Sequence, residues 1–446
     1  MTLRMLLLSL VVAPLALAAG PDASLVTEAT LKNGMKVLIW PDKDIPNAAL
    51  YLWFKVGSRN EAPGITGVSH FFEHMMFNGA KKYGPGEFDR VMEAAGGSNN
   101  AFTSTDVTVY QDWFPMTAWK TILDLEQDRI GSLAIDPKMV ESERGVVYSE
   151  RRMRVDDDNA SFLDEQVRAA AFTAHPYQIP VIGWPSDIET WTLEDLRRHF
   201  KTYYAPNNAT LVLVGDVDPK VVLPQLEKTL GKIPKQPPPR PVLTKEPEQK
   251  GERRVRVVED TPISIVEVAF HAPAPSDPNF RALSLLQSVL TVGESSRLHT
   301  RLVDRERVAI GVASALDEGF DPGLLTIVVD VAEGQDTARV EALIFEELAV
   351  ITKDGLTEAE LAKAKRGALV SFWDALATIN GKAYALGAFE TFRGGWKALF
   401  GMPKAVDAVT LDSVKAAAAI FRRENATIGL FGPDRKAKPA ASEVAP

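Results

Sequence analysis

The stretch that decides the fold of this chain is Gly67–Phe77, GVSHFFEHMMF. Its apolar residues recur at the spacing i, i+3, i+4, i+7 and i+8, and they are Val68, Phe71, Phe72, Met75 and Met76. This period of about 3.6 predicts a helix that packs through one apolar stripe. His70, Glu73 and His74 then lie on the opposite face, where two imidazoles one turn apart can chelate a single zinc ion. We therefore predict a metal site on the outer face of a core helix.

A catalytic zinc site needs a third protein ligand, and the segment 136–154, DPKMVESERGVVYSERRMR, offers candidates. Asp136 can cap a helix there and Pro137 can open it. Glu143 and Glu150 are seven residues apart and share a face with the apolar residues Met139, Val140, Val146 and Val147. We expect both carboxylates to be buried, which is costly unless they are paired or bind a metal. The spacing leaves open which of the two is the ligand.

Composition and charge narrow the class of protein. The chain has 446 residues, of which 46% are hydrophobic and 24% charged, as in globular proteins of more than one domain. Its 50 basic and 59 acidic residues give a formal charge of -9. Because no long basic run is present either, no nucleic-acid partner is expected.

The N-terminus has the pattern of a cleaved export signal at residues 1–19. Arg4 precedes an apolar run over Met5–Leu17, and Ala16 and Ala18 supply small residues at the positions that a signal peptidase recognises. The run is shorter than the roughly 18 apolar residues that span a membrane, and no later stretch is long and apolar enough to span one. The chain has no cysteine, so neither disulfides nor a lipid-modified cysteine is available. We expect an exported protein, periplasmic or secreted, without a membrane span.

The segment 232–254, KIPKQPPPRPVLTKEPEQKGERR, is rich in proline and charge, which indicates a linker between two domains. We predict an N-terminal domain at 20–231, this linker, a C-terminal domain at 255–435 and a disordered tail at 436–446. Both domains begin with a strand, a turn, a second strand and a helix. We infer an internal duplication of an α+β unit.

The motifs HFFEH, at His70–His74, and ERGVVYSE, at Glu143–Glu150, resemble those of the pitrilysin and mitochondrial processing peptidase family, the zinc peptidases with an inverted motif. Three further stretches fit the first domain of that family: NAFTSTDVTVY at 100–110, HPYQIPVIGWPSDI at 175–188 and YYAPNNATLVLVGDVD at 203–218. GESSRL at 293–298 fits its second domain. The resemblance therefore spans both halves.

This resemblance implies a zinc-dependent endopeptidase of two homologous α+β domains, each an antiparallel sheet covered by helices, with paired units forming a clamshell around a peptide. It makes His70, His74 and Glu150 the ligands of one Zn²⁺ per chain. Glu73 becomes the base that takes a proton from the attacking water, and Glu143 a carboxylate that supports the ligands. Zinc is favoured over manganese or cobalt because it suits imidazole ligation and is the commonest occupant of such sites. The remaining histidines are expected to be structural or exposed: His175, His199, His271 and His299.

Substrate binding is expected at the segment 100–110, whose alternation predicts a strand. At an exposed sheet edge, Asn100, Ala101, Phe102 and Thr103 would bind an extended peptide through main-chain hydrogen bonds, as the resemblance also implies. The alternative is an ordinary core strand with Phe102 and Val107 inward. Backbone recognition would favour extended, unfolded chains of varied sequence.

One departure from the family concerns an arginine and a tyrosine seven residues apart, which follow the Ser-Arg-Leu motif of a later domain. Here SRLHTRLVDRERVAIGVAS places Val303 and Ile310 at those positions. Nearby arginines at 301, 305 and 307 lie at other helix angles. We therefore predict a heterodimer in which a homologous subunit supplies the missing pair and itself lacks an intact zinc motif.

Two alternatives remain open. The chain could be a non-catalytic structural or assembly subunit of the same family, although all four groups of the zinc motif are present. It could also be a self-sufficient homodimeric peptidase, which the missing pair argues against.

Overall fold

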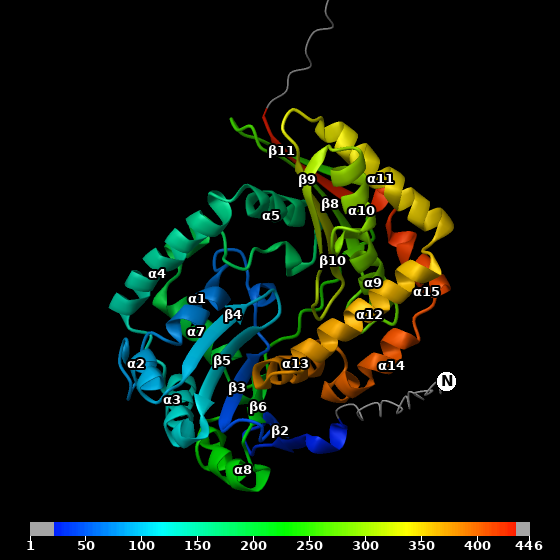
Figure 1. The fold of residues 1–446 in the computed structure, drawn as a ribbon. Helices are drawn as coiled ribbons and strands as arrows, with labels where there is room; N and C mark the ends of the chain where they lie inside the picture. Colours follow the sequence, from blue (N-terminus) through cyan, green and yellow to red (C-terminus); the bar gives the residue numbers. More distant parts are fainter. Residues whose placement is uncertain (1–21, 434–446) are drawn as a thin grey trace, which may run out of the picture.

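The computed structural model describes residues 22–433. The export signal expected at 1–19 and the tail expected at 436–446 lie outside these residues. Two sheets, each flanked by helices, make up the molecule (Figure 1), which confirms the α+β class and its two units. Within 22–433, no helix combines the length and apolarity needed to cross a bilayer.

The first sheet has six strands in the order β1-β2-β6-β3-β5-β4. Their bounds are β1 (Thr27–Thr30), β2 (Lys36–Pro41), β3 (Asn47–Phe54), β4 (Ser98–Thr103), β5 (Thr108–Pro115) and β6 (Ala209–Gly215). The second sheet has five strands in the order β7-β11-β8-β10-β9. Their bounds are β7 (Arg253–Val258), β8 (Ser264–Ala272), β9 (Ala309–Leu316), β10 (Gly323–Val331) and β11 (Ala426–Gly432).

The two sheets share one topology, which supports the inferred duplication. If β2, β6, β3, β5 and β4 are matched with β7, β11, β8, β10 and β9, every pairing has the same direction. The sheets are mainly antiparallel, as expected, and each also contains one parallel pair, β2 with β6 and β7 with β11. The partners in each parallel pair are separated by most of a domain, and such long crossovers leave no local sequence signal.

Helices cover the sheets. In the first half they are α1 (Val68–Met75), α2 (Glu87–Ala94), α3 (Trp119–Ser132), α4 (Pro137–Arg151), α5 (Asn159–Ala171), α6 (Pro185–Thr190), α7 (Leu193–Tyr203) and α8 (Pro219–Lys228). In the second half they are α9 (Phe280–Thr291), α10 (Arg297–His299), α11 (Thr337–Asp354), α12 (Glu358–Ala375), α13 (Ile379–Phe392), α14 (Met402–Asp407) and α15 (Leu411–Ala417). Asp136 caps α4 by accepting from the backbone N–H groups of Lys138 and Met139, and Pro137 opens it as expected.

Each half gives one helix to the sheet of the other. α5 packs on β7, β8 and β11 of the second sheet, while α13 packs on β3 and β6 of the first (Figure 1). The apolar cluster under α13 contains Trp53 and Leu386, and the one under α5 contains Leu163 and Ile265. Both sheets are thus buried on two faces, and neither sheet is covered by its own half alone.

The segment between the short helical turn Leu230–Lys232 and β7 contains no helix or strand. It overlaps most of the predicted linker at 232–254, and its residues make contacts with the rest of the chain. The carboxylate of Glu246 accepts hydrogen bonds from the backbone N–H groups of Thr173, Ala174 and His175, each at 2.9 Å. These bonds attach it to the first half.

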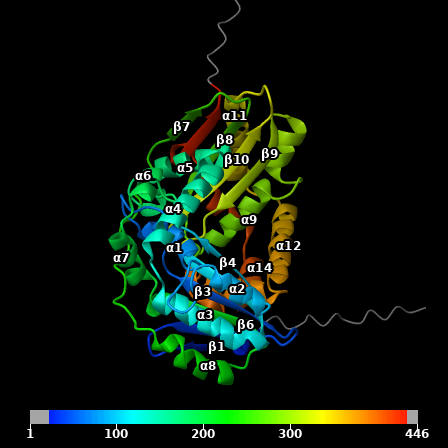
Figure 2. The ribbon, with the colours of Figure 1, turned by 90° about the vertical axis from the view of Figure 1, so that its left-hand side faces the viewer.

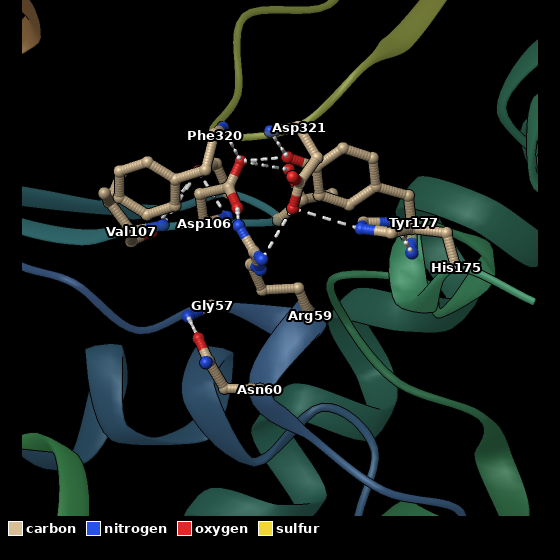
Figure 3. Close-up of polar contacts among 11 residues, drawn as sticks. Gly57, Arg59, Asn60, Asp106, Val107, His175, Tyr177, Phe320 and Asp321 are labelled. Atoms are coloured by element: carbon tan, nitrogen blue, oxygen red, sulfur yellow. Dashed lines mark hydrogen bonds and ion pairs between the residues drawn. The ribbon is translucent and has the colours of Figure 1, made fainter. Parts of the chain in front are cut away.

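The equivalent hairpins β4–β5 and β9–β10 meet at a buried polar junction (Figure 3). Asp106, between β4 and β5, accepts hydrogen bonds from Arg59 Nη1 at 2.9 Å, Tyr177 Oη at 2.7 Å and the backbone N–H of Phe320 at 3.1 Å. Arg59 Nη2 also lies 2.6 Å from Asp321 Oδ2. This junction fixes the loop between β9 and β10 against the first half, so that β9 and its sheet lie above α1 and β4 in Figure 2.

Candidate metal centre

Helix α1 buries the predicted apolar stripe. Its five side chains are no more than 1% exposed: Val68, Phe71, Phe72, Met75 and Met76. Gly67 caps the helix with a φ of 83°, and a Cβ there would lie 2.3 Å from the carbonyl oxygen of Ile182. The carboxylate of Glu61 accepts from the N–H groups of Gly67 at 2.6 Å and Ser69 at 2.7 Å. Glu61, which sequence reasoning missed, therefore anchors the start of the metal-site helix.

Three potential ligand atoms converge beside α1. Oε2 of Glu150 lies 3.2 Å from Nε2 of His74 and 3.6 Å from Nε2 of His70. Ligands placed tetrahedrally at 2.0–2.1 Å from zinc are about 3.4 Å apart, so these spacings fit a shared ion. The ligand atoms of His70, His74 and Glu150 all lie within 4.8 Å of one another. Among residues 22–433, no other set of three such side chains meets this criterion.

Glu143 plays a different part from Glu150. Its Oε1 accepts from Nδ1 of His74 at 2.8 Å, and its Oε2 accepts from Nδ2 of Asn78 at 2.7 Å. A carboxylate on the outer nitrogen of a ligating imidazole fixes the ring orientation and raises its basicity. With both oxygens already bonded, Glu143 is suited to supporting His74, which leaves Glu150 as the carboxylate available to a metal.

The face of α4 that carries these two glutamates lies along the site and is only partly buried. Their side chains are 12% and 15% exposed. Val140 and Val147 are buried, whereas Val146 is 48% exposed. Glu143 and Glu150 are thus mostly covered, in line with the expected burial, although Val146 on the same face is open to solvent.

Electrostatics distinguish the two imidazoles. Burial lowers the pKa of His70 to about 4, helped by the neighbouring His74. Burial acts in the same direction on His74, but hydrogen bonds to Glu143 and Glu150 outweigh it and raise the pKa of His74 to about 9. In the metal-free protein, His74 is therefore the imidazole whose proton a cation must displace.

Glu73 projects beside this group and is held by the edge strand of the first sheet. Thr103 Oγ1, at the end of β4, donates a hydrogen bond of 2.6 Å to Glu73 Oε2. Burial raises the pKa of Glu73, and the Thr103 hydrogen bond opposes that rise. The sequence placed Thr103 among the substrate-binding candidates but did not reveal this contact.

The predicted substrate strand 100–110 is a hairpin and not one strand. Ser104 Oγ accepts from the backbone N–H groups of Asp106 and Val107, both at 3.2 Å, and the chain reverses between β4 and β5. The Ser-Thr-Asp cluster was a turn signal that strand periodicity obscured. β4 is an edge strand, which is what peptide addition requires.

Of the four predicted substrate-binding residues on β4, Ala101 packs against the apolar core that also contains the buried side chains of α1. Phe102 packs on the other face, with its ring centroid 6.1 Å from that of Trp53. Asn100 is exposed. Phe102 is thus half-buried on an edge strand, and substrate binding at β4 stays a prediction.

The remaining histidines have contacts of a structural kind. His199 lies 3.2 Å from Ser69 Oγ and stacks on Phe72, and burial lowers its pKa to about 3. His175 accepts from the backbone N–H of Tyr177 and faces Asp321 at 3.2 Å, within the junction of Figure 3. Neither belongs to the group of metal-ligating atoms.

The positions that lack the arginine and tyrosine lie in the second half. Val303 packs against the core of that half, and Ile310, on β9, is 73% exposed. Arg301 does not replace the missing arginine, because its guanidinium faces Glu346 at 2.5 Å and Glu347 at 3.6 Å.

Comparison with known proteins shows which proteins this chain is similar to. Residues 36–184 match the sequence model described as insulinase (peptidase family M16), and residues 190–368 match the peptidase M16 inactive domain. The chain is 33% identical over 344 residues to zinc protease PqqE of Helicobacter pylori, covering 75% of this chain and 77% of that protein. It is 26% identical to the uncharacterized zinc protease YmxG of Bacillus subtilis, covering 91% and 97% respectively. The crystal structure of a protease from Helicobacter pylori superposes with a TM-score of 0.88 at 29% identity, covering 92% of this chain and 99% of that one.

Proposed function

Because this chain belongs to peptidase family M16, we propose that it is a zinc-dependent endopeptidase that hydrolyses extended or unfolded peptides. The observation that carries the proposal is the position of Glu150 Oε2, 3.2 Å and 3.6 Å from the two Nε2 atoms of His74 and His70. Beside it, Glu73 is held by a strand that can receive a peptide.

In this proposal His70, His74 and Glu150 hold one zinc ion. The bound ion would polarise the scissile carbonyl and make water acidic near neutral pH. Glu73 accepts the proton of the attacking water at its carboxylate and returns it to the leaving amine. Thr103, by donating to Glu73, favours the ionised form that can act as a base. Glu143 keeps the His74 ring in place through Nδ1.

The edge strand β4 suggests how the substrate is held. An extended peptide added beside Asn100, Ala101, Phe102 and Thr103 would bond through its main chain, largely independently of its side chains. Since Thr103 lies at the end of this strand and contacts Glu73, such a peptide would run directly toward the base. This favours unfolded chains over folded ones.

We further propose that a homologous subunit completes the site. Loss of one oxyanion donor typically costs about 100- to 1,000-fold in rate, and this chain has neither the arginine nor the tyrosine at 303 and 310. The exposed Ile310 and the engaged Arg301 offer no replacement. The partner would carry the Arg/Tyr pair without an intact zinc motif.

The test is hydrolysis of a quenched, unstructured peptide by the chain lacking residues 1–19, with zinc measured on the same sample. We expect one zinc per chain, little turnover alone and strong turnover with the partner. Glu73→Gln should retain zinc and abolish that turnover. Near-normal activity of Glu73→Gln would remove the assigned base.

The two alternatives give different results in the same assay. A non-catalytic structural subunit would bind no zinc in stoichiometric amount and remain inactive with every partner. A self-sufficient homodimer would turn over fast alone, and Glu73→Gln would abolish that turnover. Either outcome would contradict the proposal that the chain works only as a heterodimer.

We also infer export to the periplasm or medium, on the sequence pattern of residues 1–19. Mass spectrometry of the natural protein should find an N-terminus near residue 20. If the protein were found in the cytosolic fraction with residues 1–19 still attached, this assignment would be contradicted.

A further inference from the structure

Arg154 contacts the oxygen of Glu150 that faces away from the imidazoles. Its Nε lies 2.9 Å from Oε1, whereas Oε2 faces His70 and His74. The Glu150 side chain is only 15% exposed, and that of Arg154 is 70% exposed. One carboxylate is thus shared between a guanidinium on the solvent side and two imidazoles on the inner side.

The backbone between Glu150 and Arg154 is fixed at Arg151. Arg151 donates to both oxygens of Glu165, at 2.8 Å and 2.9 Å, and to the carbonyl of Gly183 at 2.8 Å. The helix then widens into a π-helical turn over Arg152–Asp156. Arg151 therefore fixes the backbone next to Glu150. Among the described residues, only Arg154 makes a polar contact with Oε1 of Glu150.

We propose that Arg154 is a positioning residue for the metal: by holding Oε1, it presents Oε2 of Glu150 as the single ligand oxygen. The inference rests on the proposed zinc site. A carboxylate without this restraint can rotate about its last bond and offer two oxygens, which changes both the affinity and the coordination number of the site. Partners of ligating groups typically contribute 10- to 100-fold to metal affinity.

The charge of Arg154 works against its hydrogen bond, so the two effects must be separated. A cation near the site repels Zn²⁺ and by itself lowers affinity. Because the guanidinium is largely in water, this repulsion is screened, and we expect the orienting hydrogen bond to dominate. Removing Arg154 should then weaken zinc binding, although it removes a positive charge.

The test is a zinc competition titration of the metal-free mature chain against a chromogenic chelator, without any peptide substrate. Arg154→Met should bind zinc at least tenfold more weakly, and Arg154→Lys should recover part of that loss because an ammonium can still donate. The matched control is Arg152→Met, which removes an exposed arginine of the same π-helical turn. Thermal unfolding of the metal-free forms should be nearly unchanged, since the Arg154 side chain that is replaced lies largely in water.

Cobalt provides a second readout that a general loss of structure would not produce. The visible absorption of the Co²⁺-loaded parent should be intense, as for four-coordinate ions, and that of Arg154→Met weaker, because a second oxygen raises the coordination number. A change in zinc affinity below threefold, a gain in affinity, or an equal loss in Arg152→Met would overturn the proposal. A parent that binds zinc but cleaves nothing would contradict the proposed function and leave this inference standing. A parent that binds no zinc would end both.

Discussion

Helix α13 meets the first sheet at Gly387, and we expect Gly387→Ala to destabilise the chain. A methyl group there would lie 2.0, 2.2 and 2.7 Å from Nε1, Cε2 and Cζ2 of Trp53. These atoms belong to one rigid ring that is 1% exposed, so the helix must move away. Overpacking of this kind costs about 1–3 kcal/mol, and alanine regains about 1 kcal/mol over glycine in a helix. From the upper end of that range, the net loss is about 2 kcal/mol.

Urea unfolding followed by circular dichroism measures this difference. Gly367→Ala is the matched control, since Gly367 lies in the neighbouring α12, is exposed and has no heavy atom within 4 Å of an added Cβ. It should stabilise the chain by up to about 1 kcal/mol. The same substitution thus has opposite signs in two adjacent helices. In a double variant, Trp53→Phe should relieve part of the loss, because the smaller ring removes the closest atom.

The reasoning would be refuted if Gly387→Ala were as stable as the parent, or stabilised as Gly367→Ala is expected to be. That result would mean that α13 does not pack on Trp53. The reciprocal cover of the two sheets by α5 and α13 would then lose its support on the α13 side.

Three further predictions concern the site, a buried carboxylate and the junction between hairpins. Thr103→Val should lower kcat/KM of the active enzyme about tenfold or more. It should also move the acid limb of the pH profile to higher pH, because the lost hydrogen bond had lowered the pKa of Glu73. Thr103→Ser should do neither. Burial raises the pKa of Glu267 to about 9 from an ordinary 4.5. The folded state thus keeps a proton that the unfolded state releases, so the parent's stability falls between about pH 4.5 and 9. Glu267→Gln should therefore raise the melting temperature more at pH 8 than at pH 5, and an equal shift at both would contradict this. Gly319→Ala would place a Cβ 2.4 Å from Tyr177 Oη and should cost about 1–3 kcal/mol in urea unfolding, while Gly251→Ala, in open space, should have little effect.

The sequence by itself determined the features that depend on neighbours within one helix. Side chains three and four residues apart share a helical face, so the order of apolar and chelating residues at 67–77 sufficed to place His70 and His74 together with Glu73. Asp136 and Pro137 likewise predicted the start of α4 correctly. The repeated order of strands and helices indicated the duplication, because the type of each element can be predicted from its own local pattern.

Other features needed contacts between distant segments. Glu143 and Glu150 share one helix face, and only the position of α4 against α1 shows that Glu143 bonds Nδ1 of His74 while Glu150 faces both Nε2 atoms. The hydrogen bond from Thr103 to Glu73 depends on where a sheet edge passes a helix.

The exchange of α5 and α13 between the two sheets was also decided by the tertiary structure alone. Both helices are amphipathic or apolar, and such a face indicates that a helix must be covered without indicating by what. Periodicity specifies which side of an element is buried because burial depends on local geometry. The partner of that side is chosen by the packing of the whole chain, so no local pattern records it.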